Sequence, residues 1–175
     1  MGDKNIINEG KLYGIIPSRY GSTRFPGKPL CMIGGKAMVE HVYERVLNSG
    51  YFERVLVATD DSRIYDYVNG FGGEAIMTDA RHNSGSERCE EVSRLLKLKD
   101  EDILINIQGD EPFIEGIHIS LVAESFKDRS VTISTLAKRI EREEELWDPN
   151  VVKVLISVLG YAIYFSRQTI PYQRN

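Results

Sequence analysis

Residues 14–30 read GIIPSRYGSTRFPGKPL, and this stretch decides how the rest of the sequence is interpreted. It begins as the end of a short apolar strand and breaks at Pro17 into a loop rich in glycine and hydroxyl side chains. The loop carries three cations, Arg19, Arg24 and Lys28. Glycines let backbone N–H groups approach a ligand closely and cations neutralise negative charge, so the loop suits a triphosphate. A solvated surface loop with turn residues would have the same composition.

The composition is that of an ordinary globular protein. The chain has 175 residues, of which 42% are apolar and 27% charged, so one domain is the first expectation. A net charge of −4 argues against a general nucleic-acid-binding or acidic-membrane-binding surface, and any anion site is therefore local. Cys31 and Cys89 form neither a disulfide framework nor a zinc-ligand spacing. We see no signal-peptide core and no run of membrane-spanning length, and expect a cytoplasmic enzyme without nucleic-acid or membrane partners.

Apolar and helical patterns alternate along the chain, which predicts an α/β fold built from βαβ units. The expected strands span residues 11–17, 54–59, 74–77, 103–108 and 130–137, with a hairpin of 151–156 and 161–165. The expected helices span residues 37–48, 86–97, 114–127 and 141–147, and a further helix that contains residues 64–71 is capped by residues 60–62 and ends at Gly72-Gly73. We expect strand 103–108, which contains ILINIQ, to be the most completely buried.

Ligands of open α/β sheets bind beyond the carboxyl ends of the strands. Three polar loops leave such ends here: the basic loop, Asp60-Asp61 and residues 109–112, so we expect them around one crevice. Asp110 suits Mg²⁺, which bridges carboxylates to phosphates, although an acid before a proline is also a common turn residue. The cationic loop after another strand favours the metal interpretation. Helix capping explains Asp60 and Asp61 more simply than ligand binding does.

Histidine and serine spacing predicts neither a metal centre nor covalent catalysis. His82, in HNSGSER, has no nearby His or Cys partner, and a structural hydrogen bond or a substrate contact would explain it equally well. The sequence contains no legible Ser/His/Asp or Cys/His arrangement.

Long pieces of the sequence resemble the 3-deoxy-manno-octulosonate cytidylyltransferases of Gram-negative bacteria. In family order they are IIPSRYGSTRFPGKPL, GGKAMVEHVYERV, VLVATDDSRI, GGEAIMTDARHNSGSERCEEV, INIQGDEPFI, ISTLAKRI, DPNVVKV and GYAIYFSRQTIPYQR. The resemblance implies a three-layer nucleotide-binding α/β sandwich with a mostly parallel mixed sheet, similar to the GT-A glycosyltransferases. It also implies a reaction in which the anomeric hydroxyl of the sugar acid Kdo attacks the α-phosphate of CTP and pyrophosphate leaves, for lipopolysaccharide biosynthesis.

The resemblance assigns roles to particular residues. The implied CTP-binding residues are Ser18, Arg19, Arg24, Lys28, His82, Ser84, Gly85 and Glu87. The implied catalytic residues are Arg19, Lys28 and Asp110, and Asp110 would bind Mg²⁺. The implied sugar contacts are Gln108 and Arg167, whose guanidinium suits the Kdo carboxylate. Without the resemblance, Arg167 is better explained as a surface cation at the end of a strand.

The sequence departs from the family pattern in two places. Family members run on beyond Ile-Pro-Tyr into a tail that carries sugar contacts, part of a dimer surface and a second metal-binding aspartate. Residues 151–159, VVKVLISVL, also lack the polar turn expected before Gly160. We therefore expect residues 1–175 to form a single nucleotidyltransferase domain, C-terminally incomplete, from a full-length homodimer. The alternatives are a truncated CTP-binding module without turnover and a cytidylyltransferase for a related sugar acid, such as an amino analogue of Kdo.

Overall fold

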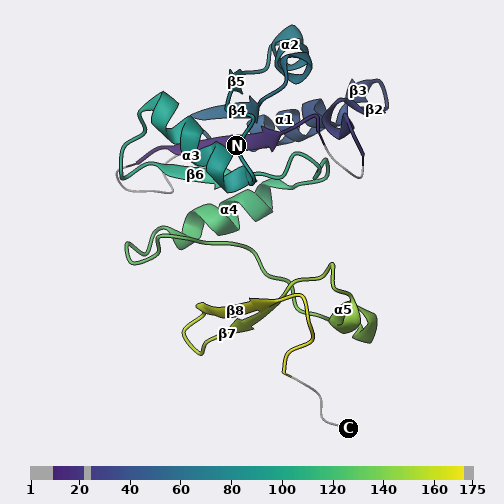
Figure 1. Cartoon of the computed structure of the whole chain (residues 1–175). Coiled ribbons are helices and arrows are strands. Elements are labelled where there is room, and N and C mark those ends of the chain that lie inside the picture. The colour runs from purple at the N-terminus through teal and green to yellow at the C-terminus, as the bar shows by residue number, and fades with distance from the viewer. Residues whose placement is uncertain (1–9, 22–24, 172–175) are drawn as a thin grey trace. The chain divides into compact units, whose positions relative to one another are not determined.

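The structure is a computed structural model that describes residues 10–21 and 25–171 (Figure 1). Its strands are β1 (Leu12–Ser18), β2 (Met32–Ile33), β3 (Lys36–Ala37), β4 (Arg54–Thr59), β5 (Ala75–Met77), β6 (Ile103–Asn106), β7 (Lys153–Ile156) and β8 (Ala162–Ser166). Its helices are the 3-10 helix η1 (Lys28–Leu30), α1 (Met38–Asn48), α2 (Ser62–Gly70), α3 (Gly85–Leu96), α4 (Gly116–Ser125) and α5 (Glu143–Trp147). None of the described helices is long and apolar enough to cross a membrane. The chain divides into two compact units, residues 1–134 and 135–175.

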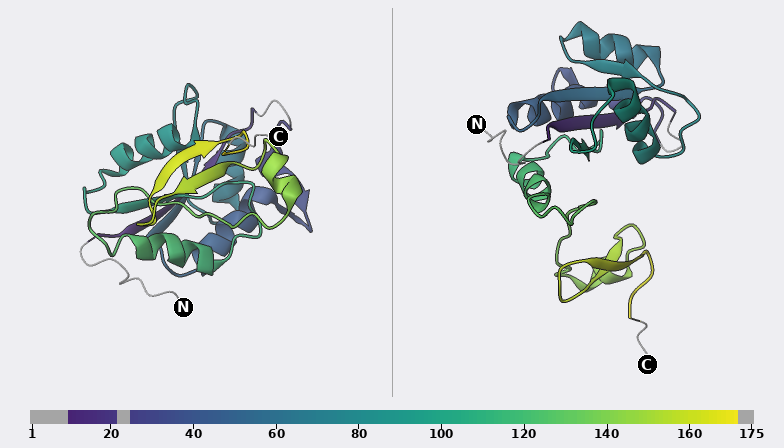
Figure 2. Two further views of the ribbon diagram at one scale, coloured as in Figure 1. Left: turned by 90° about the horizontal axis from the view of Figure 1, so that it is seen from below. Right: turned by 90° about the vertical axis from the view of Figure 1, so that its left-hand side faces the viewer.

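A parallel four-stranded sheet in the order β5-β4-β1-β6 forms the centre of the first unit. β1 pairs with β4 from Tyr13 opposite Arg54 to Ser18 opposite Thr59. The two strands lie side by side in the right-hand view of Figure 2. On its other edge β1 pairs with β6. Because the strands are parallel, their carboxyl ends meet at one edge of the sheet, and the loops after β1, β4 and β6 begin there.

Two apolar clusters, one on each face of the sheet, hold the first unit together. Successive residues of a strand point to opposite faces, so Ile16 packs in one cluster and Ile15 in the other. The larger cluster contains apolar side chains of α1, α2 and α4, and the smaller contains Cys89 and Val92 of α3. The sheet therefore lies between helical layers, which is the three-layer α/β sandwich that the family resemblance implies.

The prediction that residues 103–108 form the most buried strand is wrong. β6 ends at Asn106, and Ile103 and Leu104 are only half-buried. β1 and β4 are more completely buried, because each has a paired strand on both sides. In the described sheet β6 has a partner on one side alone. An apolar run indicates a strand, but it does not indicate whether that strand lies at the centre or the edge of a sheet.

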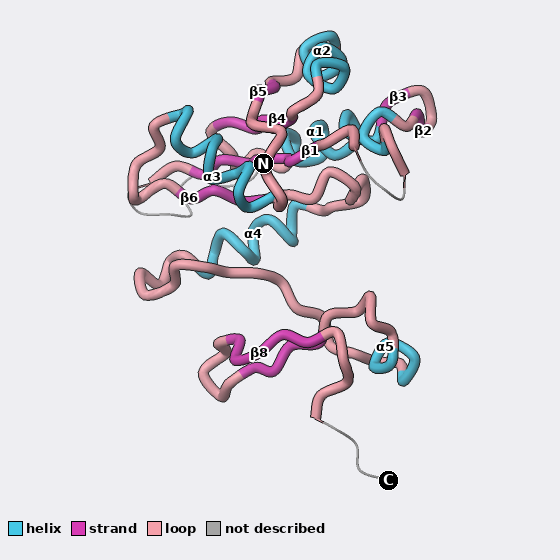
Figure 3. Tube along the Cα trace, viewed as in Figure 1, coloured by secondary structure: helices cyan, strands magenta, loops and turns pink. Residues whose placement is uncertain are grey.

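The strand predicted at residues 130–137 is also not formed. These residues belong to the long loop between α4 and α5, drawn in pink in Figure 3. Ile133 is 89% exposed, and among the described residues no strand pairs with this segment. Its β-branched residues favour extended backbone, but an extended segment needs a hydrogen-bonding neighbour to become part of a sheet.

The second unit contains the predicted hairpin, in which β7 and β8 pair antiparallel from Lys153 opposite Ser166. Its turn closes without the expected run of polar residues. The Ser157 N–H donates to the Tyr161 carbonyl at 2.8 Å, and the Tyr161 N–H donates to the Ser157 hydroxyl oxygen at 3.1 Å. Gly160 has a φ of 85°, which a glycine adopts without steric cost. One serine and one glycine therefore make a turn in an otherwise apolar stretch.

Candidate active site

The order in which the strands are connected predicts a ligand-binding crevice beside β1. From β1 the chain moves to β4 and then β5 on one side, and it then crosses through α3 to β6 on the other side. The direction of winding therefore reverses between β1 and β6. In open α/β sheets this reversal point, at the carboxyl ends of the strands, is where ligands bind. The loops that leave β1 and β6 are the basic loop and the loop with Asp110, as the sequence predicts.

Lys28 and Asp110 meet at this edge. The Lys28 Nζ lies 2.6 Å from Asp110 Oδ2, although the residues are 82 positions apart in sequence. Lys28 begins η1, and Asp110 lies four residues beyond β6. The two side chains are 37% and 51% exposed, so solvent and solutes reach both. The cationic loop and the acidic loop thus share one location, which is the central expectation from the sequence.

Gly109 explains how the two loops come so close. A Cβ at this position would lie 2.9 Å from the Ser18 hydroxyl oxygen and 3.1 Å from the Pro17 carbonyl oxygen. The backbone after β6 therefore passes directly against the end of β1. A residue without a side chain permits this approach, which puts Gln108 and Asp110 next to the basic loop.

A hollow of about 170 Å³ opens at the same edge. Six predicted site residues line it: Ser18, Arg19, His82, Ser84, Gly85 and Gln108. Pro17, Asn83 and Arg88, which were not predicted, complete the lining. Ser18 is buried at the end of β1, whereas Arg19 and Gln108 are exposed. A larger hollow of about 450 Å³ lies at the amino ends of β1 and β6, contains none of the predicted site residues and is away from this chemistry.

Ser84 and Glu87 make a cap at the beginning of α3. The Ser84 hydroxyl oxygen accepts the Glu87 N–H at 3.2 Å, and a Glu87 carboxylate oxygen accepts the Asn83 N–H at 2.7 Å. This arrangement resembles a capping box, in which a serine and a glutamate satisfy free amides at a helix start. The cap orients the first turn of α3 along the wall of the hollow. A role in binding cytidine stays a prediction for both residues.

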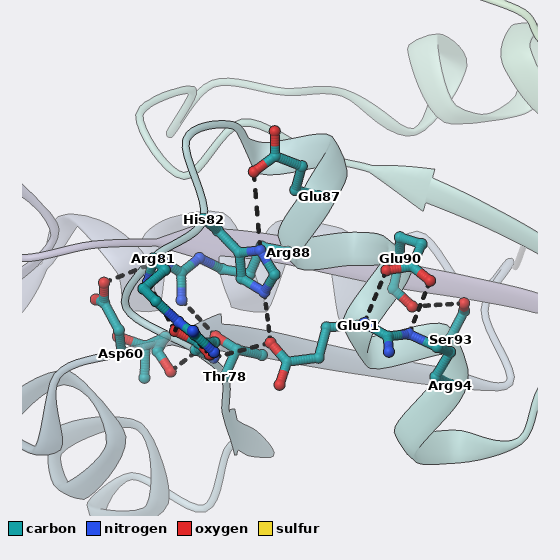
Figure 4. Close-up of polar contacts among 12 residues, drawn as sticks. Asp60, Thr78, Arg81, His82, Glu87, Arg88, Glu90, Glu91, Ser93 and Arg94 are labelled. Atoms are coloured by element: carbon teal, nitrogen blue, oxygen red, sulfur yellow. Dashed lines mark hydrogen bonds and ion pairs between the residues drawn. The ribbon is translucent and has the colours of Figure 1, made fainter.

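His82 lies between two carboxylates, as Figure 4 shows. Its Nε2 is 2.5 Å from Glu91 Oε2, and its Nδ1 is 3.8 Å from Glu87 Oε2. Glu91 also accepts the Asp79 N–H at 2.8 Å. The Asp79 amide, and then the His82 ring, hold the pKa of Glu91 below its usual value. The sequence allowed either a structural hydrogen bond or a substrate contact for His82, and the structural hydrogen bond is present. Sequence reasoning missed Glu91, because the loop fold is what brings its partners Asp79 and His82 to it.

The two aspartates after β4 have different partners. The Asp61 carboxylate accepts the Arg63 N–H at 3.0 Å and caps α2, which confirms the capping interpretation for this residue. Asp60 instead pairs with Arg88, whose Nη2 lies 3.0 Å from Asp60 Oδ2. Arg88 is only 3% exposed. Sequence reasoning missed it because an arginine on a helix is usually a surface residue.

Two further predicted site residues are Arg24 and Arg167. Arg24 lies outside the described residues. Arg167 belongs to the second unit, where it follows β8 and its Nη1 donates to the Pro149 carbonyl at 2.9 Å. That contact suits the simpler interpretation of Arg167 as a cation at a strand end. Its proposed role toward a sugar carboxylate stays a prediction.

The acidic side of the site suits a metal ion that is shared with a phosphate ligand. In the described part of the chain, no three His, Cys, Asp or Glu side chains are grouped as a metal cage. Mg²⁺ does not need such a cage, because it keeps several waters and takes one or two carboxylates together with substrate phosphates. Asp110 offers hard oxygen ligands at an exposed position, and the Lys28 ammonium already lies there as a cation. The donor set therefore fits Mg²⁺ held with a nucleotide.

Comparison with known proteins shows the family to which this chain is related. The chain matches the family model described as cytidylyltransferase over residues 13–175. It is 50% identical to the 3-deoxy-manno-octulosonate cytidylyltransferase of Thermodesulfovibrio yellowstonii and 52% identical to that of Syntrophus aciditrophicus. These alignments cover 92% and 94% of this chain but 65% and 67% of the relatives, so the chain spans about two thirds of their length.

A solved structure is also similar. It is that of CMP:2-keto-3-deoxy-manno-octonic acid synthetase complexed with CTP, with a TM-score of 0.82 and 41% identity over 95% of this chain and 68% of that one. This neighbour confirms the predicted fold class, that of the GT-A-like nucleotidyltransferases. The chain therefore belongs to the cytidylyltransferase family. Its relatives at about 50% identity are 3-deoxy-manno-octulosonate cytidylyltransferases, which confirms the resemblance carried by its motifs.

Proposed function

We propose that this chain transfers CMP from CTP to the anomeric hydroxyl of 3-deoxy-D-manno-octulosonate (Kdo), giving CMP-Kdo and pyrophosphate. The observation that carries the proposal is the 2.6 Å contact between Lys28 and Asp110 at the reversal point of the sheet. A phosphate-binding cation and a metal-binding carboxylate have to be adjacent to hold one triphosphate. The family, and the CTP in the related structure, support cytidine as the nucleoside.

The proposed reaction is an in-line substitution at phosphorus. A bond forms between the anomeric oxygen of Kdo and the α-phosphorus, and the bond from that phosphorus to the bridging oxygen breaks. Pyrophosphate leaves with the electron pair, and the hydroxyl proton passes to solvent. The chain's part is to position the two substrates and to neutralise charge, since a phosphoryl group needs little covalent help from the protein.

Each loop has one task in this proposal. Arg19 and Lys28 bind the phosphates of CTP, and the buried Ser18 holds the end of β1 beneath them. Asp110 binds Mg²⁺, which when bound neutralises charge on the phosphate oxygens. Gln108, on the wall of the hollow, contacts the sugar acid. The first turn of α3 and the loop before it surround the cytidine.

A nucleotide panel with Kdo and Mg²⁺ tests the proposal. Pyrophosphate release is measured with CTP, UTP, ATP and GTP, and we expect release with CTP to exceed release with each other nucleotide. Asp110→Asn is the matched variant, since it keeps the shape of the side chain and removes its charge, and we expect it to abolish turnover. Binding of CTP without any release of pyrophosphate would instead indicate a nucleotide-binding module. Equal rates with an amino analogue of Kdo would argue for a different sugar acid.

The proposal extends to the setting of the enzyme. A supplier of CMP-Kdo for lipopolysaccharide biosynthesis uses cytoplasmic CTP, so we propose a cytoplasmic location. We also propose that the full-length protein is a homodimer, as the resemblance implies. Sedimentation of the full-length protein measures this directly, and a monomer at micromolar concentration would contradict it.

A further inference from the structure

The least exposed charged side chain at the candidate site has no role in the proposed chemistry. Arg88 is 3% exposed and lies in the first turn of α3, where it lines the hollow. A charged residue is almost never fully buried unless it is paired, because it loses its hydration. The residues that pair with Arg88 therefore have to compensate its charge.

The guanidinium of Arg88 contacts residues at the ends of two strands, as Figure 4 shows. One terminal nitrogen, Nη2, donates to Asp60 Oδ2 at 3.0 Å, and Asp60 directly follows β4. The other, Nη1, donates to the hydroxyl of Thr78, which directly follows β5. The Thr78 hydroxyl in turn donates to the Thr59 carbonyl at 3.0 Å. One planar fork thus connects α3 with the carboxyl ends of β4 and β5.

Arg88 and the residues just before it form one wall of the hollow. Asn83, Ser84 and Gly85 line it, and they lie in the loop and first turn that lead to Arg88. A Cβ at Gly85 would lie 3.4 Å from the Pro17 side chain, so this turn sits directly against the end of β1. If the guanidinium were lost, the turn would keep its own cap at Ser84, and α3 would keep its apolar packing on the sheet, but the polar link from Arg88 to Asp60 and Thr78 would be gone.

We infer that Arg88 is a positioning residue for the nucleotide, which holds residues 83–85 at the distance from the sheet that a pyrimidine nucleoside requires. The inference rests on the proposed function, because the ligand is taken to be CTP. Arg88 acts through Ser84 and Gly85, and its pairing with the half-buried Asp60 compensates the buried guanidinium charge. The sugar acid contacts other loops in the proposed function, so Arg88 affects the nucleotide alone.

The chain offers a matched control at the opposite ends of the same strands. Arg54 begins β4 and pairs with Glu74, which directly precedes β5. This second ion pair also joins β4 to β5, but it is far from the hollow along both strands. Arg54→Met therefore removes an arginine–carboxylate pair between the same two elements without touching the candidate site.

Dissociation constants for CTP and for Kdo, measured separately on the full chain by calorimetry, test the inference. For Arg88→Met we expect CTP to bind at least tenfold more weakly, with Kdo binding unchanged within twofold. Arg88→Lys keeps the charge but reaches one partner at a time, so we expect it to restore part of the CTP affinity. Thr78→Val keeps the ion pair and is expected to weaken CTP binding by less than Arg88→Met. Arg54→Met is expected to leave both constants unchanged.

Thermal unfolding separates misfolding from mispositioning. If Arg88→Met does not fold, Arg88→Lys and Thr78→Val decide the question, since both retain a compensated Asp60. Unchanged CTP affinity in folded Arg88 variants, or equal weakening of CTP and Kdo, would overturn the inference while leaving the proposed function in place. A wild-type chain that does not bind CTP would overturn both.

Discussion

Lys28 and Asp110 form an ion pair at the candidate site, and each would have to leave the other to bind a ligand of its own. Both side chains are more than one third exposed. An exposed ion pair contributes about 0.2–1 kcal/mol to stability, so the pair does not hold the fold together. In the proposed function, Mg²⁺ and the triphosphate would therefore separate the two charges at low cost, with Asp110 binding the metal ion and Lys28 the phosphates.

The residue Lys28 yields a prediction about metal binding. The substitution Lys28→Met removes the ammonium group that would compete with a metal ion for the Asp110 carboxylate. The ligand-free chain is therefore expected to bind Mn²⁺ more tightly. An ion-pair energy of about 0.2–1 kcal/mol corresponds to a gain of roughly 1.4- to fivefold in affinity. Electron paramagnetic resonance of free Mn²⁺ measures this without turnover. Lys11→Met is the control, since Lys11 pairs with Glu53 at 2.7 Å at the other end of β1. Unchanged Mn²⁺ affinity in Lys28→Met would argue that the pair does not restrict the metal site.

Glu91 yields a prediction about pH. The pKa of Glu91 in the folded chain is lowered, first by the Asp79 N–H and then by His82. A carboxylate with a lowered folded pKa stabilises the protein above its unfolded pKa of about 4.5, and this stability is lost as the pH falls through the folded value. We therefore expect Glu91→Gln to be less stable than wild type at pH 7, by up to about 1.5–3 kcal/mol, the range for a hydrogen bond to a charged group.

The difference between wild type and Glu91→Gln is expected to shrink as urea unfolding is repeated from pH 7 to pH 3. The control is Glu90→Gln on the same helix, where the exposed Glu90 pairs only with Arg94 in the described contacts. A difference that stays constant across this range would contradict the role assigned to the Glu91 charge.

At the scale of elements, the site depends on the approach of the loop after β6 to the end of β1. Gly109→Ala is expected to push these elements apart, because its Cβ would lie 3.1 Å from the Pro17 carbonyl oxygen, a backbone atom that cannot rotate away. Overpacking of this kind costs about 1–3 kcal/mol. We expect lower stability in urea and a larger loss of CTP turnover, since Gln108 and Asp110 move with the loop.

Gly116→Ala is the control for Gly109→Ala. Gly116 begins α4, and the nearest atom to an added Cβ would be 3.8 Å away, an ordinary contact. An alanine there is expected to be neutral or slightly stabilising. If the two substitutions had the same effect on turnover, the close approach at Gly109 would not be what aligns the site.

Local signals predicted most elements well. β4 has the predicted bounds, and Asp61 caps α2 as expected. The failures are strands whose formation depends on neighbours. Residues 130–137 have strand propensity but no partner in the described structure, and β6 is an edge strand there despite its apolar sequence. Propensity and periodicity are properties of one segment, whereas pairing is a property of two.

At the scale of the whole molecule, the layered fold gives the two cysteines different surroundings. Cys89 is buried between α3 and the sheet, and burial raises the pKa of its thiol to about 12. Cys31 is half-exposed. Only thiolates react readily with alkylating reagents. We therefore expect iodoacetamide at pH 8 to label Cys31 in the folded chain and Cys89 only after unfolding, as read by peptide mass spectrometry. Equal labelling rates would contradict the burial of α3 against the sheet.

The sequence predicted the site residues that lie in loops with a local signal, but not Arg88 and Glu91 on α3. Lys28 and Asp110 lie in loops that carry their own signals, glycines and cations in one and an acid after a strand in the other. Arg88 and Glu91 carry no such signal, because a charged residue on a helix is usually on the surface. Their importance comes from Asp60, Thr78 and Asp79, which the fold brings to them.

The sequence by itself determined the family, the α/β class and the two loops that meet, because these depend on motifs and on patterns within single segments. Only the tertiary structure decided that β6 lies at an edge of the described sheet, that His82 is fixed between two glutamates and that Arg88 is buried against Asp60. These features arise from contacts between residues that are distant in the chain, and no local pattern encodes which distant partner a side chain will meet.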